Sequence, residues 1–237
     1  KESRKVLRKL KKIKKIKQTD ARVNITETQT KEAIKRTKNS KALGPDEISP
    51  LMLKHLGPNG IRYLTHIYNE CVNTATIPAL WKTGRIIPLL KPGKPADAGS
   101  SFRPISLLSP PAKVLESILL PEITDSINLA RHQHGFRKGH STTTALHNIN
   151  NFITEGLNKD KPVHRTVAVA IDLSRAFDTV NHDMLLEDID ELQLNGYIKR
   201  FLCAYIRGRQ TYVEFRGSRS RCRKMLQGVP QGGVLSP

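Results

Sequence analysis

The sequence predicts an α+β fold, because helical and extended segments alternate along its 237 residues without a regular βαβ repeat. The composition agrees with this class. The chain is 38% hydrophobic and 26% charged, which is typical of a globular protein with a buried core. No apolar run approaches the length of about 18 residues that a membrane-spanning helix needs, so no membrane partner is expected.

The chain opens with a strongly basic segment. Residues 1–17 contain ten Lys or Arg, and their apolar residues recur at spacings of four and three, which predicts a basic helical arm over residues 1–23. Such an arm either contacts phosphates or is a solvated helix end, and the sequence does not choose between the two.

Helices are predicted wherever apolar residues recur at helical spacing. Thr26 is a suitable N-cap for the first of them, Gly44-Pro45 ends its helical pattern, and Pro121 would kink a later one. The predicted helices cover residues 24–38, 49–56, 60–76, 112–129, 141–157, 182–192 and 196–206.

Strands are predicted where β-branched and apolar residues cluster between polar turns. Pro104 makes one of them an edge or irregular strand, because proline cannot donate to a ladder. The run Val167–Ile171 is continuously apolar and is therefore predicted to be a central strand with both faces buried. The predicted strands cover residues 85–90, 102–108, 167–171, 211–215 and 222–226, and the last two are expected to pair.

The charge of the chain points to a polyanionic partner. Lys and Arg number 40 and Asp and Glu number 21, so the net charge is +19, which suits a nucleic acid or an anionic membrane surface. The three cysteines, Cys71, Cys203 and Cys222, are far apart and predict reduced thiols in an intracellular protein rather than disulfides or a zinc site.

Asp172 directly follows the apolar run 167–171 and has two interpretations. Its position alone favours a cap for the next helix. Its surroundings favour metal-assisted phosphoryl transfer, because Mg²⁺ prefers carboxylate oxygens and cations balance phosphate charge. The cations that could do so are Lys91, Lys94 and Arg103 beside a strand pair, and Arg137 and Lys138 in a Gly-containing loop.

A second candidate is the segment Gln227–Gly233. Three glycines and a proline in seven residues exclude regular helix or strand and allow close approach of the backbone to a ligand. The segment is either a surface turn or a polar contact loop, and the two glutamines that frame it favour the loop.

Together these segments resemble a known family. AIDLSRAFDTVNH at 170–182 and QGVPQGGVLSP at 227–237 are similar to two motifs of reverse transcriptases, and SKALGPDEI, GRIIPLLKPGK, FRPISLL and QHGFRKGHSTTTAL precede them in the expected order. Over residues 24–237 the combination most resembles non-LTR (LINE-type) retrotransposons of the jockey group. The resemblance implies a truncated right-hand polymerase. Fingers with a palm helix would cover residues 24–163. The first part of a palm, with an antiparallel sheet and flanking helices, would cover residues 164–237.

The resemblance also implies roles for individual residues. Asp172 matches the catalytic, metal-binding aspartate, and the carbonyl of Leu173 would lie beside the same one of two Mg²⁺ ions. Arg103 and Lys91, with Lys94 as a rival, match the cations that hold the triphosphate of a nucleotide. Phe177 matches the ring that excludes a ribose 2′-OH, and Gln231 the glutamine beside the sugar and base. Residues expected to contact nucleic acid are Arg137, Lys138, Gly228, Pro230 and Gly232.

The implied activity is the copying of element RNA into DNA, with an RNA template, a DNA primer and dNTPs as partners, in the nucleus and in cytoplasmic ribonucleoprotein. The family's Tyr-x-Asp-Asp hairpin does not occur in these 237 residues. We therefore expect a fragment, cut at both ends, that does not polymerise alone. Leu43 and Gly233 are smaller departures from the family pattern.

Two alternatives remain open. One is a non-catalytic nucleic-acid-binding remnant or co-opted fragment, which would keep the basic surface and lack chemistry. The other is a maturase-type reverse transcriptase of group II introns, which FRPISLL and VPQGGVLSP favour less than the LINE type.

Overall fold

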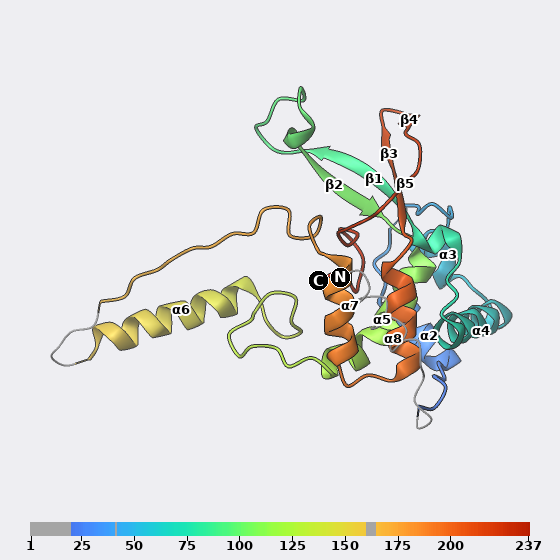
Figure 1. Ribbon diagram of the computed structural model, residues 1–237, viewed down its shortest axis with the longest axis horizontal. Coiled ribbons are helices and arrows are strands. Elements are labelled where there is room, and N and C mark those ends of the chain that lie inside the picture. The colour runs from blue at the N-terminus through green and yellow to red at the C-terminus, as the bar shows by residue number, and fades with distance from the viewer. Residues whose placement is uncertain (1–19, 41, 160–164) are drawn as a thin grey trace, which may run out of the picture. The chain divides into compact units, whose positions relative to one another are not determined.

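The structure is a computed structural model that describes residues 20–40, 42–159 and 165–237 (Figure 1). It contains two compact units. The first comprises the described residues up to Ser126 together with Arg175–Ser236, and the second comprises Ile127–Ser174 with Pro237. The predicted basic arm lies outside the described residues except for residues 20–23. The predicted boundary between fingers and palm at 163/164 stays a prediction.

The helices of the first unit begin at capping residues that the sequence displays. Thr26 forms a capping box with Gln29, and Ser49, Ser109, Asn181 and Asn195 each accept a backbone N–H of the helix that follows. The predicted helices are confirmed to within a few residues. They are α2 (Glu27–Arg36), α3 (Pro50–Lys54), α4 (Pro58–Thr74), α5 (Pro110–Asp125), α7 (His182–Glu191) and α8 (Gly196–Ile206).

These helices enclose the hydrophobic core of the first unit. Helix α2 contacts α4 and α5, and α8 contacts α4 and α7. Tyr68 is fully buried at the centre, where its hydroxyl donates a 2.8 Å hydrogen bond to the carbonyl of Pro111 at the start of α5. Burial also raises the pKa of the neighbouring Cys71 thiol to about 11, so this cysteine is an apolar core residue rather than a reactive one.

The sheet of the first unit is mixed, with the strand order β2-β1-β3-β4 and with β5 also paired to β3. Its strands are β1 (Thr83–Leu90), β2 (Phe102–Leu107), β3 (Gln210–Phe215), β4 (Ser218–Arg219) and β5 (Arg223–Lys224). Strand β2 lies at the edge, as Pro104 predicts, and Pro104 faces Pro88 across the ladder.

The predicted pairing of the last two strands is confirmed as antiparallel by β3 and β5, and β1 and β2 are antiparallel as well, whereas β1 and β3, whose pairing the sequence did not predict, are parallel. The reason is the connection between them. The chain passes through α7 and α8 before β3, and such a long crossover can return the chain beside β1 in the same direction.

The second unit contains α6 (Thr142–Leu157), which confirms the helix predicted over residues 141–157 and begins with a capping box between Ser141 and Thr144. No helix in the described part of the chain is both long and apolar enough to cross a membrane.

The predicted central strand 167–171 is wrong. No described strand pairs with this segment, and Val167, Val169 and Ile171 are 83%, 78% and 87% exposed. An apolar run becomes a buried strand only when neighbouring strands satisfy its backbone and cover its faces. The described residues supply no such neighbours, so the segment is neither a strand nor buried.

Two asparagines on α4 anchor the extended segment that precedes α2. The side-chain amide of Asn69 accepts the Ile25 N–H at 2.7 Å and donates to the Ile25 carbonyl at 2.8 Å. One turn later, Asn73 makes the same two bonds with Val23, at 2.9 and 2.8 Å. Each side chain therefore pairs with the backbone as a neighbouring strand would.

We expect Asn69→Leu to lower the free energy of unfolding by about 1–3 kcal/mol, because the N–H and carbonyl of Ile25 lose their partners in a partly buried place. Urea denaturation measures the change. Asn59→Leu, at an exposed position of the same helix, is the control and should cost less than about 0.5 kcal/mol. Equal losses in the two variants would contradict the anchoring role.

Candidate functional site

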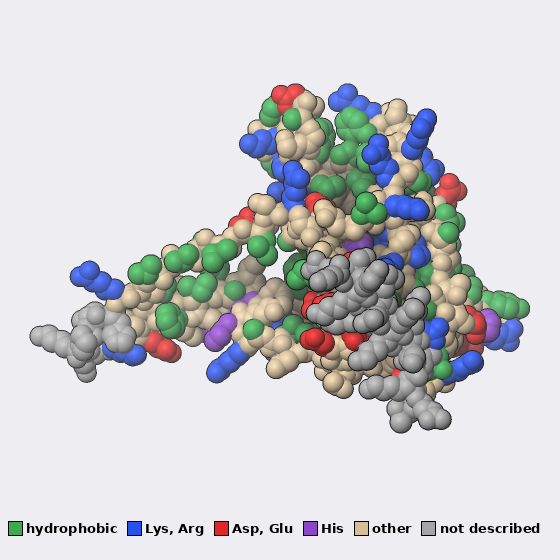
Figure 2. All heavy atoms as spheres, in the orientation of Figure 1, with side chains coloured by type: hydrophobic (Ala, Val, Ile, Leu, Met, Phe, Trp, Pro, Cys, Tyr) green, Lys and Arg blue, Asp and Glu red, His purple; other side chains and the backbone are tan. Residues whose placement is uncertain are grey.

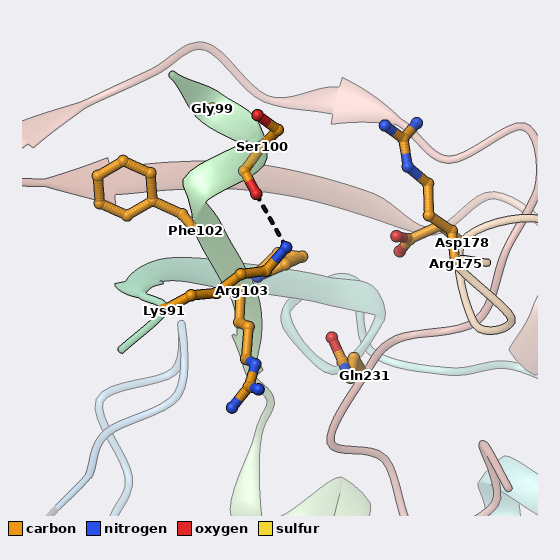
Figure 3. A pocket seen from close by; sticks show the side chains of 9 residues that line it. Lys91, Gly99, Ser100, Phe102, Arg103, Arg175, Asp178 and Gln231 are labelled. Atoms are coloured by element: carbon orange, nitrogen blue, oxygen red, sulfur yellow. Dashed lines mark hydrogen bonds between the residues drawn. The ribbon is translucent and has the colours of Figure 1, made fainter. Parts of the chain in front are cut away.

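A cavity of about 490 Å³ opens in the first unit beside the β1–β2 hairpin (Figure 3). Three of its lining residues are cations and one is a carboxylate, so its lining carries a net positive charge that suits a polyphosphate. The lining residues are Lys91, Gly99, Ser100, Phe102, Arg103, Pro104, Arg175, Asp178 and Gln231.

The hairpin places two of the predicted nucleotide-binding cations on the cavity. Arg103 lies on β2 opposite Leu89 of β1, and Lys91 follows the end of β1. The Lys91 side chain donates to the carbonyl of Ser100 at 2.8 Å, which fixes its position on the cavity wall. Lys91, Arg103 and Gln231 thus come together, whereas Lys94 is not one of the lining residues among those described.

Two further lining residues were not predicted as site residues. Arg175 and Asp178 lie in a tight turn in which the Asp178 N–H donates to the Arg175 carbonyl at 2.9 Å, and Arg175 has a left-handed φ of 55°. Figure 3 shows both side chains on the side of the cavity opposite Ser100 and Phe102. Their only signal in the sequence is their place inside the motif at 170–182.

The glycine-rich loop is joined to this turn by three hydrogen bonds. The N–H groups of Gly228 and Val229 donate to the carbonyls of Val180 and Phe177, both at 2.8 Å. His182 Nε2 donates to the Gly228 carbonyl at 2.6 Å. Gly228 has a φ of 81°, and a Cβ there would lie 2.8 Å from the Asp178 carbonyl oxygen, so only glycine fits this approach. The loop is therefore attached to the fold through its backbone and is not a free surface turn.

The other side of the same loop is attached to strand β2. The Ser106 N–H donates to the Gln231 carbonyl at 3.1 Å. Gly232 has a φ of 125°, and a Cβ on it would lie 2.8 Å from the Ser106 carbonyl oxygen. This attachment holds Gln231 on the cavity that Arg103 also lines.

A buried carboxylate on α5 holds the end of the loop. Glu116 is 1% exposed, and its Oε2 accepts the N–H groups of Val234 at 2.6 Å and Leu235 at 3.1 Å. Burial raises the pKa of this carboxyl, while the two N–H groups and the positive charge of Arg209 act in the opposite direction. Glu116 had no signal in the sequence, because a Glu in a helical pattern is usually solvated.

The remaining predicted site residues occupy different surroundings. The Phe177 side chain is half-buried and does not line the cavity among the described residues, although its carbonyl holds the loop. Asp172, Leu173, Arg137 and Lys138 belong to the second unit. Asp172, Leu173 and Lys138 are exposed, and Arg137 donates to the Ala130 carbonyl at 3.3 Å. The predicted convergence of Asp172 with Arg103 and Gln231 stays a prediction.

The described residues do not contain a group of three or more His, Cys, Asp or Glu that could hold a metal ion. Mg²⁺ needs near-octahedral oxygen coordination. The Asp172 carboxylate and the Leu173 carbonyl are oxygen donors of the right kind, so they fit part of such a site and do not complete it.

Comparison with protein families identifies the class of this chain. Residues 90–237 match the model of the reverse transcriptase (RNA-dependent DNA polymerase) family. This segment contains the cavity, the turn at 175–182 and the glycine-rich loop. The chain belongs to the reverse transcriptase family.

Individual relatives support the resemblance to non-LTR retrotransposons. The chain is 37% identical over 87% of its length to a probable RNA-directed DNA polymerase from transposon BS of Drosophila melanogaster. It is 35% identical over 87% of its length to the corresponding protein from the X-element of the same species. It is 33% identical over 90% of its length to the RNA-directed DNA polymerase from mobile element jockey of Drosophila funebris. The chain spans about a quarter of these relatives, 23% of each.

We expect Glu116→Gln to change how stability depends on pH. The folded state holds a proton on Glu116 more tightly than the unfolded state, because the pKa is raised from its ordinary value of 4.5. The stability of the native protein should therefore fall as pH rises from 4.5 through the raised pKa, and Gln removes this contribution because it does not titrate. The difference in free energy of unfolding between the native protein and Glu116→Gln should therefore shift in favour of the variant as pH rises from 4.5 through the raised pKa.

Urea denaturation between about pH 4 and pH 8 measures this difference. Glu70→Gln, which neutralises an exposed carboxylate, is the control for the general effect of one charge. Stability curves that stay parallel for native protein and Glu116→Gln would contradict the buried, proton-binding state of Glu116.

Proposed function

We propose that this chain is part of an RNA-directed DNA polymerase of a non-LTR retrotransposon, which copies element RNA into DNA. The observation that carries the proposal is the convergence of Lys91, Arg103 and Gln231 on one cationic cavity of a chain of the reverse transcriptase family. The names of the similar transposon and mobile-element polymerases support the same activity.

The cavity would receive the incoming dNTP. Lys91, Arg103 and Arg175 would offer positive charge to the triphosphate. Each of the two guanidinium groups can bind two phosphate oxygens at once. Gln231, fixed by its carbonyl on β2, would lie against the sugar and base. Phe177 would exclude a ribose 2′-OH. The template and primer would contact the loop at Gly228, Pro230 and Gly232, with Arg137 and Lys138 as further phosphate contacts.

Divalent metal ions are generally required in the reverse transcriptase family. In this chain Asp172 and the Leu173 carbonyl would hold Mg²⁺, which supplies charge stabilisation at the reacting phosphate when bound. The residues of the chain itself bind and orient. The cations hold the triphosphate, and the loop fixed by Glu116 and His182 keeps Gln231 in place. Nuclear and ribonucleoprotein localisation is part of the same proposal.

The two alternatives are less well supported. A maturase-type enzyme is disfavoured because the similar proteins named above come from transposons and mobile elements. A non-catalytic binding remnant would have no reason to keep a nucleotide-sized cavity lined by Lys91, Arg103 and Gln231. An assay of DNA synthesis separates the remnant from the polymerase.

The activity can be tested in a chimera in which this chain replaces the matching 217 residues of the jockey polymerase of Drosophila funebris. Primer extension on an RNA template with dNTPs and Mg²⁺ should proceed with the chimera and not with the 237-residue chain alone. Asp172→Ala should lower extension by about a hundredfold or more, since even outer partners of metal ligands contribute about 10–100-fold. RNA binding should stay within about twofold, because Asp172 carries no positive charge for phosphate. Unchanged extension would contradict the metal-binding role.

Phe177→Ala in the same chimera should raise the incorporation of ribonucleotides relative to deoxynucleotides by about tenfold or more, equal to about 1.4 kcal/mol of lost discrimination. The reason is that the ring proposed to exclude the 2′-OH is removed. Competing rNTP and dNTP in the extension assay measure the ratio. Tyr63→Ala, which removes an exposed ring on α4 that does not line the cavity, is the control and should leave the ratio unchanged. A ratio that rises equally in both variants would contradict the assigned role of Phe177.

A further inference from the structure

The hairpin formed by β3, β4 and β5 carries a dense positive charge, and the proposed function assigns no role to its charged residues. Its segment 216–224, here called the arginine hairpin, contains four arginines and one lysine in nine residues and no Asp or Glu. Every residue of the segment is exposed. Figure 2 shows Lys and Arg side chains gathered over this end of the sheet. Its cations are Arg216, Arg219, Arg221, Arg223 and Lys224.

The backbone of the arginine hairpin is held in a defined shape. Strands β3 and β4 pair through Phe215 and Ser218 around the two-residue turn Arg216-Gly217, in which both residues have positive φ values of 49° and 78°. The Ser220 N–H donates to the Val213 carbonyl at 2.9 Å, and β5 pairs with the start of β3. An arginine at the first turn position is unusual, because Asn, Asp or Gly adopts this conformation at lower cost.

Aromatic rings orient two of the arginines. The guanidinium carbon of Arg219 lies 3.8 Å from the centroid of the Tyr212 ring, and that of Arg216 lies 5.1 Å from the centroid of the Phe215 ring. A guanidinium that stacks on a ring keeps its N–H edge free for phosphate oxygens, and it loses less side-chain freedom on binding.

The nearest carboxylate in the ladder is already neutralised. Glu214 lies directly opposite Arg219 in the β3–β4 register, but it pairs with Arg85 of β1 at 2.6 Å. Among the described residues, no Asp or Glu forms an ion pair with any of the five cations. The positive charge of the arginine hairpin is therefore not neutralised by any ion pair among the described residues.

The arginine hairpin adjoins the cavity. Strands β1 and β3 are parallel, so the turn after β3 and Lys91 after β1 lie at the same end of the sheet. The ring of Phe215 contacts that of Phe102, which lines the cavity, with ring centres 5.7 Å apart. A polyanion that reaches the cavity from this end passes the arginine hairpin.

We propose that the arginine hairpin binds the phosphate backbone of a single-stranded RNA that leads to the cavity, without reading its bases. This inference deepens the proposed function and rests on it for RNA as the polyanion, but its test is separate, because phosphate binding does not require DNA synthesis. The exposed segment offers charge rather than a hydrogen-bonding pattern for particular bases, so binding should depend on salt and little on sequence.

The test uses the 237-residue chain and a fluorescently labelled oligouridylate, with affinity measured over a range of salt concentrations. Changing Arg216, Arg219, Arg221 and Arg223 together to Gln should weaken binding. It should also make the slope of log K against log salt shallower by about 0.7 for each lost phosphate contact. Changing the same four to Lys should keep the slope, because lysine also neutralises phosphate. Thermal unfolding of both variants confirms that the fold is retained.

The matched control removes four cations elsewhere, with Lys31, Lys35, Arg36 and Lys38 on and after α2 changed to Gln. This variant has the same net charge and should keep a steeper slope than the arginine-hairpin variant. The proposal is overturned if the two Gln variants change the slope equally, if the arginine-hairpin variant leaves it unchanged, or if the Lys variant loses it. Because the readout is RNA binding, a chain that never polymerises can still confirm or refute it.

Discussion

Backbone hydrogen bonds to the glycine-rich loop are the constraint on which the candidate site depends. Gly228 and Val229 join the loop to the turn at 175–182, Gln231 joins it to β2, and Val234 and Leu235 join it to α5 through Glu116. These attachments connect segments that are far apart in the sequence. They require backbone-to-backbone approaches that a Cβ on Gly228 or Gly232 would block. A shift of this loop would therefore move Gln231 away from the cavity.

The buried Glu116 links the helical core to the site. A carboxylate without water is costly, and here two N–H groups of the loop and the nearby charge of Arg209 offset part of that cost. The same bonds that satisfy the carboxylate fix the end of the loop. The stability of the core and the geometry of the site are consequently not independent in this chain.

Positive charge is concentrated at one end of the sheet. Lys91, Arg103 and Arg175 line the cavity, and the arginine hairpin adjoins it through the contact of Phe215 with Phe102. The carboxylate of Glu214 is paired with Arg85 and so does not cancel this field. An excess of cations at one place attracts phosphates more strongly than the same net charge spread evenly over a surface.

The sequence by itself determined what depends on local chemistry and on recognisable motifs. The capping residue Thr26 marked where a helix begins, Pro104 marked an edge strand, and the motifs led to Lys91, Arg103 and Gln231. Only the tertiary structure decided features that depend on distant partners. The apolar run 167–171 found no neighbouring strand among the described residues, β3 joined β1 in parallel, and Arg175, Asp178 and Glu116 became site residues. Periodicity reports which face of a segment is apolar, but not which segment covers it, because that choice is made by contacts between residues far apart in the chain.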